Sequence, residues 1–346
     1  MIASSPRPNY RFPGEWEEQE AIWFAWPVNQ SLWPGRFERV RERLLQLYSV
    51  ASRYQKVHIL CPKSEQEFIR KRLPSEYHQS SIYLHDYRCD DIWIRDYGPL
   101  FVSDEVNGIL TVADFRFDAW GKKFPNYQRD DGASQFIAQL LDLPRVNCDT
   151  VLEGGAIDSN GAGCLLTTKA VLLNPNRGQN LAMSDWRSLL EASLGISDII
   201  WLEGGLRGDD TDGHIDNLAR FISADTILVA EPDAKDTENY DQLTKNLNRI
   251  QEFAASPQTP LTVETMVMPD PIGESSDRLA ASYLNFIFLN GAVLVPFYSQ
   301  EKDAQAAATL KRLLPGRDVI GIECSDIIHE GGALHCLSQH QSRLAY

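Results

Sequence analysis

The sequence predicts an α/β fold in which small β-rich units form a ring with helices on its outside. Amphipathic helical segments alternate with short apolar strands along the chain. Asn-Gly pairs between apolar runs predict tight hairpins, and therefore many antiparallel strand pairs. The tripeptide Glu-Gly-Gly occurs three times, close behind predicted strands, which indicates one supersecondary unit used repeatedly around an axis. The inner strand ends of such a ring would converge on one central pocket.

Apolar residues at helical spacing predict six helices that flank these units: 36–54, 64–73, 134–143, 183–194, 239–255 and 301–314. In the first of them, Val40, Leu44 and Leu47 fall on one face. Ser184 is the expected N-cap of the fourth helix, and Gly195 is its expected C-terminal stop.

Short apolar runs predict strands at KVHIL (56–60), SIYLH (81–85), DIIWL (198–202), LTVETMVM (261–268) and DVIGIEC (318–324). The expected hairpin turns are Asn107-Gly108, Asn160-Gly161 and Asn290-Gly291, and the Glu-Gly-Gly copies begin at Glu153, Glu203 and Glu330. An open doubly wound sheet is the alternative fold, but the hairpins weigh against it. Because no long linker interrupts the pattern, residues 1–346 are expected to form a single catalytic domain.

The composition excludes several classes of partner. A net charge of -15 with a pI of about 4.9 argues against nucleic-acid binding, which requires a basic face. A negative field would attract small cations, but from the charge alone the favoured interpretation is that it keeps a cytosolic protein soluble. The longest early apolar run, AIWFAWP, is too short to span a membrane, and the N-terminus has no secretory signal. The six cysteines form no C-x-x-C pair, which favours reduced thiols in a cytoplasmic protein.

Five reactive side chains stand in four short motifs: Asp96 in DDIWIRDYGP, Glu153 in LEGGAID, His214 and Asp216 in DDTDGHIDN, and Cys336 in GGALHC. Three carboxylates, one imidazole and one thiol are the groups needed to hold a guanidinium cation and attack its central carbon. The set therefore predicts a reaction as well as a small cationic guanidino substrate.

Asp96 and Asp216 are the expected clamp for the guanidinium, since carboxylates accept its forked N–H groups. A structural salt bridge between Asp96 and adjacent Arg95 is the alternative. His214 and Asp216 have i, i+2 spacing, which on a strand would put both side chains on one face. His214 can then transfer protons near neutral pH, with Glu153 orienting it. The alternative for Glu153 is a structural carboxylate that accepts backbone N–H groups beside its two glycines.

Cys336 is the expected nucleophile. It follows Gly331-Gly332, which allow the backbone to approach a ligand closely, and a bound guanidinium could itself supply the charge that favours a thiolate. Thiolate attack would form a covalent intermediate that water resolves. A triad-type hydrolase built on Cys336 and His214, an amidinotransferase, and a guanidinium-binding protein without turnover are the alternatives.

Competing motifs fail. GDDTDG resembles a calcium loop, but Gly208 stands at the first ligand position and Ala219 at the closing one. Histidines and cysteines show no zinc spacing, and no phosphate-binding glycine motif follows a strand. The sequence therefore shows none of these calcium, zinc or nucleotide-phosphate motifs.

The sequence resembles the agmatine deiminase and bacterial-type peptidylarginine deiminase family, within the guanidino-group-modifying superfamily. The resemblance runs from GEWEEQEAIWFAWP (14–27) through LLTTKAVLLNPNRG (165–178) to LHCLSQHQ (334–341). It implies a five-bladed α/β propeller of the pentein type with pseudo-fivefold symmetry, no cofactor, and a homo-oligomer such as a dimer or tetramer.

The resemblance also implies a role for each of the site residues. Cys336 would be the nucleophile and His214 the general acid and base, with Glu153 paired to His214 and to the substrate. Asp96 and Asp216 would hold the guanidinium, and Trp93 would line the pocket. Agmatine would yield N-carbamoylputrescine and ammonia, a step of putrescine and polyamine biosynthesis.

The chain departs from the family pattern at positions that could contact the far end of the substrate: Asp118, Asp210, Glu330 and Ala333. Asp210 is nevertheless an expected substrate-binding residue. Agmatine is the leading substrate, and peptidyl or free arginine is the alternative. Arg116 could pair with a substrate carboxylate, or form a structural ion pair with Asp114 or Asp118.

Overall fold

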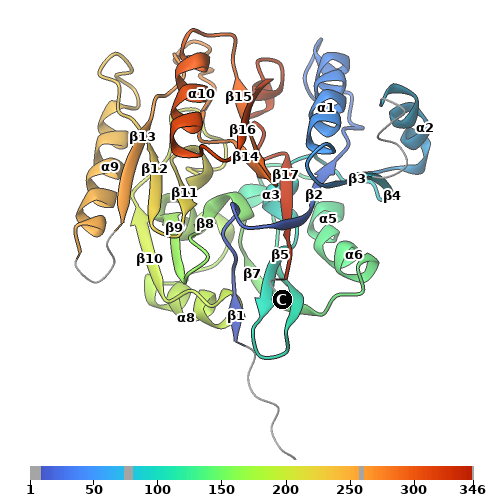
Figure 1. Ribbon diagram of the computed structural model, residues 1–346, viewed down its shortest axis with the longest axis horizontal. Helices are drawn as coiled ribbons and strands as arrows, with labels where there is room; N and C mark the ends of the chain where they lie inside the picture. The colour runs from blue at the N-terminus through green and yellow to red at the C-terminus, as the bar shows by residue number, and fades with distance from the viewer. Residues whose placement is uncertain (1–8, 74–80, 257–260, 345–346) are drawn as a thin grey trace, which may run out of the picture.

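The computed structural model describes residues 9–73, 81–256 and 261–344 and has an α/β architecture. Its strands form five separate sheets, and the longer helices lie at the periphery with the strands inside them (Figure 1). The α/β prediction is therefore confirmed, and the open doubly wound sheet is excluded for the part of the chain that the structure describes.

The five sheets repeat one pattern. An antiparallel hairpin is followed by a helix and then by a third strand that runs parallel to the second. In the second sheet these elements are β8 (Ile157–Ser159), β9 (Cys164–Thr168), α8 (Met183–Leu194) and β10 (Asp198–Leu202). The parallel pairing requires the crossover helix, whereas the hairpin needs only a short turn.

The other units have the same order. The first contains β5 (Leu100–Asp104), β6 (Ile109–Arg116), α6 (Ala133–Leu140) and β7 (Arg145–Val151), with β1 (Tyr10–Arg11) on its edge. The third contains β11 (Ala219–Ser223), β12 (Thr226–Ala230), α9 (Tyr240–Ala254) and β13 (Thr262–Met266). The fourth contains β14 (Ile287–Leu289), β15 (Ala292–Phe297), α10 (Lys302–Leu313) and β16 (Asp318–Glu323).

The fifth unit joins the two ends of the chain. Its hairpin-like pair consists of β17 (Ser338–Ser342) and β2 (Gln19–Ala25), which are antiparallel although they are far apart in sequence. It continues through α1 (Phe37–Ala51), β3 (Lys56–Cys61), α2 (Lys63–Arg72) and β4 (Ile82–Asp86). The Trp23 indole N–H donates to Gln341 Oε1 at 3.0 Å, so the two strands are also tied by their side chains.

Short helical turns lie in the loops between these strands: α3 (Ile94–Tyr97), α4 (Ala119–Lys122), α5 (Gln128–Asp131), η1 (Gly154–Ala156), α7 (Lys169–Leu172), η2 (Pro175–Arg177), η3 (Ile215–Asn217) and η4 (Ile327–Glu330). Several of these turns carry the side chains of the candidate site.

The predicted elements agree with the structure except in detail. The helices begin and end close to their predicted bounds, and the three Asn-Gly pairs join antiparallel strands. Ser184 is not the N-cap of α8, because the helix begins at Met183. Instead, the Asp185 carboxylate accepts a hydrogen bond from the backbone N–H of Ala182 at 2.9 Å. Gly195 ends this helix with φ at 71°, a left-handed conformation that favours glycine.

The Glu-Gly-Gly copies occupy related places in the fold. Glu203 directly follows β10, and Glu153 lies two residues after the end of β7; both strands are the third of their units. Glu330 ends the 3₁₀ turn after β16. The repeat that these tripeptides predict is thus a repeat of structural units.

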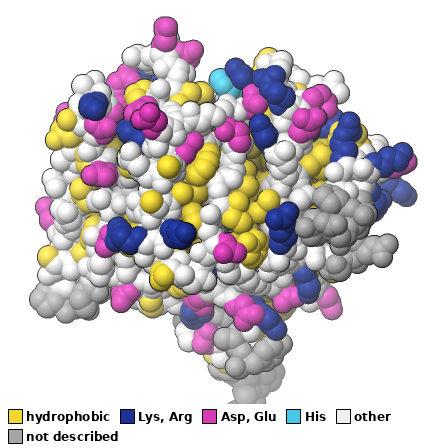
Figure 2. Space-filling model, turned by 45° about the horizontal axis from the view of Figure 1, so that its top comes forward, with side chains coloured by type: hydrophobic (Ala, Val, Ile, Leu, Met, Phe, Trp, Pro, Cys, Tyr) yellow, Lys and Arg dark blue, Asp and Glu magenta, His cyan; other side chains and the backbone are white. Residues whose placement is uncertain are grey.

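Apolar side chains fill the space between sheets and helices. The larger cluster includes Val40, Leu44 and Leu47 on the inner face of α1, as their spacing predicts, together with the buried faces of β2 and β3. A smaller cluster packs α8 against the first and second sheets through Trp186 and Leu190. Within the described ranges, no helix combines the length and apolarity required to cross a bilayer. On the face shown in Figure 2, acidic and basic side chains are interspersed.

Candidate active site

The residues of the candidate site lie in the turns that precede the first strand of each of the five repeated units. Asp96 precedes β5, Glu153 precedes β8, and Asp216 precedes β11. Asn285 precedes β14, and Cys336 precedes β17. The sequence prediction identified four of these five positions and missed Asn285.

These turns converge on a small cavity of about 40 Å³, here called the inner pocket. That is roughly three to four times the space that one water molecule needs. Its lining includes Trp93, Asp96, Asp210, His214 and Cys336, all expected from the sequence. Glu153 and Asp216 contact these residues from behind rather than lining the cavity.

Asp96 is held from two directions. Its Oδ2 accepts a hydrogen bond from the Trp120 indole at 2.9 Å, and its Oδ1 accepts one from the Gly155 backbone N–H at 3.0 Å. Burial raises the pKa of Asp96 to about 6, although His214 acts in the opposite direction. The proposed Arg95 salt bridge is wrong, because Arg95 pairs with Glu15 at 2.7 Å.

Trp120 reaches Asp96 from a strained turn. Ala119, Trp120 and Lys122 all have positive φ values, of 57°, 55° and 61°, which are uncommon for residues with a side chain. Such strain is maintained only where the surroundings enforce it. Here the Asp118 carboxylate accepts the Gly121 backbone N–H at 2.8 Å and fixes the turn.

His214 lies between two carboxylates. Its Nδ1 is 3.6 Å from Asp96 Oδ1, and its Nε2 is 3.4 Å from Glu153 Oε2. Burial alone would lower the pKa of His214, but Asp96 and Glu153 outweigh it and raise the pKa to about 9. The strand predicted for His214 and Asp216 is wrong. His214 is the N-cap of η3, and Asp216 lies within it. This 3₁₀ turn, rather than an extended strand, brings both side chains toward the site.

Glu153 is fixed by an arginine that the sequence prediction missed. Arg177 donates to both of its oxygens, at 2.8 and 3.2 Å, and also pairs with Asp212. Burial would raise the pKa of Glu153, but His214 and Arg177 hold it below its ordinary value. The alternative role as an acceptor of backbone N–H groups is not what the structure shows, since its described partners are Arg177 and His214.

Only one oxygen of the Asp216 carboxylate has a partner among the described residues. Its Oδ2 contacts His335 Nδ1 at 2.8 Å, and His335 Nε2 contacts Glu15 Oε1 at 2.8 Å. No described protein group hydrogen-bonds the buried Oδ1 of Asp216. Burial would raise the pKa of Asp216, but His335 and His214 hold it below its ordinary value. An ionised carboxylate with a free oxygen is suited to accept a cationic N–H group.

The Cys336 sulfur lies beside this carboxylate. Its Sγ is 3.6 Å from Asp216 Oδ2 and accepts a hydrogen bond from Asn285 Nδ2 at 3.2 Å. Burial, followed by the negative charges of Asp216 and Asp96, raises the pKa of the thiol well above its ordinary value. Without a bound cation the sulfur therefore favours the neutral thiol.

Two glycines leave space that other residues would fill. A Cβ on Gly155 would lie 2.6 Å from both Asp96 Oδ1 and His214 Nδ1, and 3.2 Å from Asp216 Oδ2. A Cβ on Gly332 would lie 2.4 Å from the Trp93 ring. Gly155 is thus required because three site residues approach its backbone closely. Gly332 is required because the Trp93 ring, which lines the pocket, lies against its backbone.

The rim of the inner pocket is acidic. Asp91, Asp210 and Glu330 line it, and none of its described lining residues is Lys or Arg. Burial, with smaller effects from Glu330 and Asp90, raises the pKa of Asp91 to about 7. A cation bound at this rim would restore the ionised form of Asp91.

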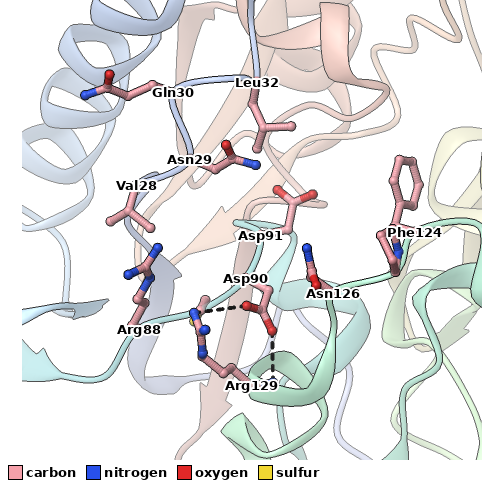
Figure 3. Close-up of a pocket in the computed structure, with 12 residues that line it drawn as sticks. Val28, Asn29, Gln30, Leu32, Arg88, Asp90, Asp91, Phe124, Asn126 and Arg129 are labelled. Atoms are coloured by element: carbon pink, nitrogen blue, oxygen red, sulfur yellow. Dashed lines mark hydrogen bonds and ion pairs between the residues drawn. The ribbon is translucent and has the colours of Figure 1, made fainter.

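A larger cavity of about 470 Å³, here called the outer cavity, adjoins the inner pocket. The two share Leu32, Asp91 and Phe124. Figure 3 shows Arg88 on the side opposite Phe124, and Asp90 paired with Arg129. Arg116 lines neither cavity, and it forms a bidentate pair with Asp131 rather than with Asp114 or Asp118.

Most of the missed residues lie inside or beside recognised motifs. Glu15, Arg177 and His335 lie inside the segments that carry the family resemblance, and Trp120 lies two residues after Asp118. Only the fold brings their side chains to the catalytic set. Asn285 had one available signal, which was its place before the first strand of the fourth unit.

The chain is similar in sequence to known proteins over nearly its whole length. The family model of the Porphyromonas-type peptidyl-arginine deiminase matches residues 11–342. The agmatine deiminase of Pseudomonas aeruginosa is 32% identical over 98% of this chain and 97% of that protein. The agmatine deiminase of Stutzerimonas stutzeri is 30% identical over 98% of both chains.

Solved structures agree over nearly the whole chain. The structure of C. jejuni agmatine deiminase with substrate bound has a TM-score of 0.88 and 32% identity, covering 97% of both chains. That of the Enterococcus faecalis agmatine deiminase has a TM-score of 0.91 and 25% identity, covering 99% of both chains. With the model match and these full-length relatives, the chain belongs to the Porphyromonas-type peptidyl-arginine deiminase family, which includes hydrolases acting on C–N bonds.

Proposed function

We propose that this protein is an agmatine deiminase, which hydrolyses the guanidinium of agmatine to N-carbamoylputrescine and ammonia. The observation that carries the proposal is the inner pocket itself. A thiol, an imidazole and a carboxylate line it together, and its rim holds carboxylates with no Lys or Arg among the described lining residues. Such a pocket suits a substrate that is positively charged at both ends.

Asp96 and Asp216 hold the guanidinium in this proposal. Asp96 accepts N–H groups from the wall of the inner pocket, where Trp93 also lies. Asp216, behind that wall, accepts a further N–H group through its unpartnered Oδ1. The bound cation lowers the pKa of the Cys336 thiol, which is raised while the pocket is empty, so that the thiol releases its proton to solvent and becomes a thiolate. Substrate binding and nucleophile activation are thereby coupled.

The reaction then runs in two halves. The Cys336 thiolate attacks the guanidinium carbon, and protonated His214 gives its proton to the departing ammonia. Water adds to the resulting S-alkylthiouronium, with His214 accepting one proton, and the carbon–sulfur bond breaks to release the ureido product. The pKa of about 9 keeps His214 protonated at neutral pH for the first half.

The acidic rim favours agmatine over arginine. The terminal ammonium of agmatine would lie near Asp91, Asp210 and Glu330, whereas the carboxylate of free arginine would be repelled by them. The relatives named above as agmatine deiminases support this choice. Although Asp210 departs from the family pattern, it is still an acidic residue, so the acidic character of the rim is retained.

Peptidyl or free arginine deimination by the same mechanism is the second candidate. The observation that favours it is the outer cavity, which offers room beyond the rim. Its Arg88 has no hydrogen bond or ion pair with another described residue, so it could receive a substrate carboxylate.

The decisive experiment measures ammonia release by the purified protein from agmatine, free arginine and an arginine-containing peptide. Cys336→Ala is the inactive control. Turnover mainly of agmatine supports the proposal, and Asp210→Asn should then raise KM for agmatine. Turnover mainly of arginine or the peptide overturns the substrate assignment and makes Arg88→Ala the next variant.

The proposal also includes the domain organisation, the symmetry, the cellular location and the oligomeric state. We infer that residues 1–346 form one catalytic domain, whose five units surround a pseudo-fivefold axis with the inner pocket at its centre. The contribution of one site residue by each unit supports this closed arrangement. We also infer that the enzyme is a cytoplasmic homo-oligomer, dimer or tetramer, which light scattering of the purified protein would test.

A further inference from the structure

The fourth unit contributes a side chain that the chemistry above does not use. Asn285 is fully buried in the turn before β14. Asp96, Glu153, Asp216 and Cys336 occupy the corresponding turns of the other units. The repeat of the fold therefore delivers Asn285 to the same place as the groups assigned to the reaction.

The orientation of the Asn285 amide is fixed by its neighbours. Its Oδ1 accepts the backbone N–H groups of His335 at 2.9 Å and Cys336 at 3.4 Å. Because a backbone N–H can only donate, the oxygen must face this segment and the NH₂ group must face away. One N–H then reaches Asn217 Oδ1 at 3.0 Å, and the other reaches Cys336 Sγ at 3.2 Å.

Few polar groups contact the Cys336 sulfur, and Asn285 is one of them. Among the described side chains, it is the one hydrogen-bond donor to Sγ, beside the backbone N–H of Ala333. The Asp216 carboxylate contacts the sulfur at 3.6 Å. A carboxylate disfavours a neighbouring thiolate, while an N–H group favours it. His214 interacts instead with Asp96 and Glu153.

We propose that Asn285 is a catalytic residue, whose amide N–H stabilises the Cys336 sulfur whenever the sulfur carries negative charge. The step that it serves rests on the proposed function. In the first half the carbon–sulfur bond forms from the thiolate electron pair, and the carbon–nitrogen bond breaks as ammonia leaves with the proton of His214.

In the second half, water adds to the amidino carbon and gives one proton to His214 and the other to the released ammonia. The carbon–sulfur bond breaks, and its electron pair returns to the sulfur. Asn285 therefore donates to the attacking thiolate and again to the leaving thiolate. A preorganised donor in a buried site provides such stabilisation without reorganising during the reaction.

Asn285→Asp is the sharpest test, because aspartate has nearly the same size and keeps the oxygen that accepts the two backbone N–H groups. An ionised aspartate has no N–H for the sulfur. The substrate-free enzyme is alkylated with iodoacetamide across a pH series, and modification of the Cys336 peptide is followed by mass spectrometry. We expect the midpoint of alkylation to move about one pH unit or more upward.

Asn246→Asp is the matched control. Asn246 is also a buried amide that ties a loop, donating to the Gly204 carbonyl at 2.9 Å, but it lies outside the site. Its variant should keep the wild-type midpoint. For agmatine turnover, Asn285→Asp should lower kcat by about 10²–10³-fold with little change in KM, as expected when one donor to a developing charge is lost.

Asn285→Ala, which removes donor and acceptor together, repeats the measurement should the aspartate variant fail to fold or carry a proton. Wild-type midpoints in the folded variants would overturn the proposal and leave Asn285 as a tie for the 335–336 segment. The two proposals fail separately. Wild-type protein that releases no ammonia from agmatine refutes the function, whereas the alkylation midpoint is measured without substrate.

Discussion

At the scale of single residues, the site works through opposed electrostatic effects. Burial disfavours the charged form of each site residue. Asp96 and Glu153 nevertheless raise the pKa of His214, and His335 and His214 hold the pKa of Asp216 below its ordinary value. For the Cys336 thiol, Asp216 and Asp96 instead add to the effect of burial, so that its pKa lies well above the ordinary value. In the proposed mechanism, a cation must therefore enter before Cys336 becomes a thiolate.

Cys336→Ala should abolish turnover while leaving agmatine binding and the fold intact. The described surroundings of the sulfur offer no second nucleophile, so the loss should be about 10⁴-fold or greater. Ammonia release, calorimetric titration with agmatine and circular dichroism check the three parts. Cys61→Ala, in β3 and remote from the pocket, is the control and should keep its activity. Residual turnover in Cys336→Ala would exclude the covalent mechanism.

Agmatine binding should weaken as the pH falls through about 6. The pKa of Asp96 is raised to about 6, so above this pH the carboxylate is ionised and holds the cation. Below it the carboxyl is neutral, and its attraction is lost. Titrations of the Cys336→Ala protein at several pH values measure the effect without turnover. In the Cys336→Ala, Asp96→Asn double variant affinity should be low at every pH, and a persisting step near 6 would assign the titration to another group.

At the scale of elements, short turns rather than strands place the reactive groups. The 3₁₀ turns η1 and η3 bring Gly155 and Asp216 to the pocket, and α3 brings Asp96. The His-x-Asp spacing predicted a shared strand face, but tertiary packing selected a tighter turn. Motif spacing identified the correct side chains, while the backbone that carries them depended on contacts with other units.

Gly155→Ala should inactivate the enzyme by about 10²-fold or more. Its Cβ would lie 2.6 Å from Asp96 Oδ1 and His214 Nδ1, so the clamp must shift, and displacements of about 1 Å have effects of this size. Ammonia release from agmatine is the measurement, with KM expected to rise. Gly316→Ala is the control, since a Cβ there meets no atom within 4 Å. Equal activity of both variants would contradict the close approach.

At the scale of the whole molecule, buried ion pairs connect the five separate sheets. Arg220 in β11 donates to Asp158 of β8 at 2.5 Å and to Glu15 at 2.6 Å. It also donates to the carbonyls of Leu284 and Phe286 beside β14. Glu15 continues the network to His335 and so to Asp216. Burial would raise the pKa of Glu15, but Arg95, His335 and Arg220 hold it well below its ordinary value.

Arg220→Ala should lower the free energy of unfolding by about 3–5 kcal/mol, because it leaves the buried Asp158 carboxylate without its cationic partner and removes one of the partners of Glu15. Urea denaturation followed by circular dichroism measures the change. Arg343→Ala removes an exposed partner of Glu18 and should change stability little. Comparable losses in the two variants would show that the buried network has no special weight.

The sequence by itself determined the α/β class, the bounds of the main helices, the hairpins and the five reactive side chains. These follow from local rules, since apolar periodicity, turn chemistry and residue type act over a few positions. Only the tertiary structure decided which partners each reactive group has. Arg177 on Glu153, Trp120 on Asp96, His335 on Asp216 and Asn285 on Cys336 are contacts between turns of different units. The physical reason is that pKa and orientation depend on distances across the packed interior, which no local pattern encodes.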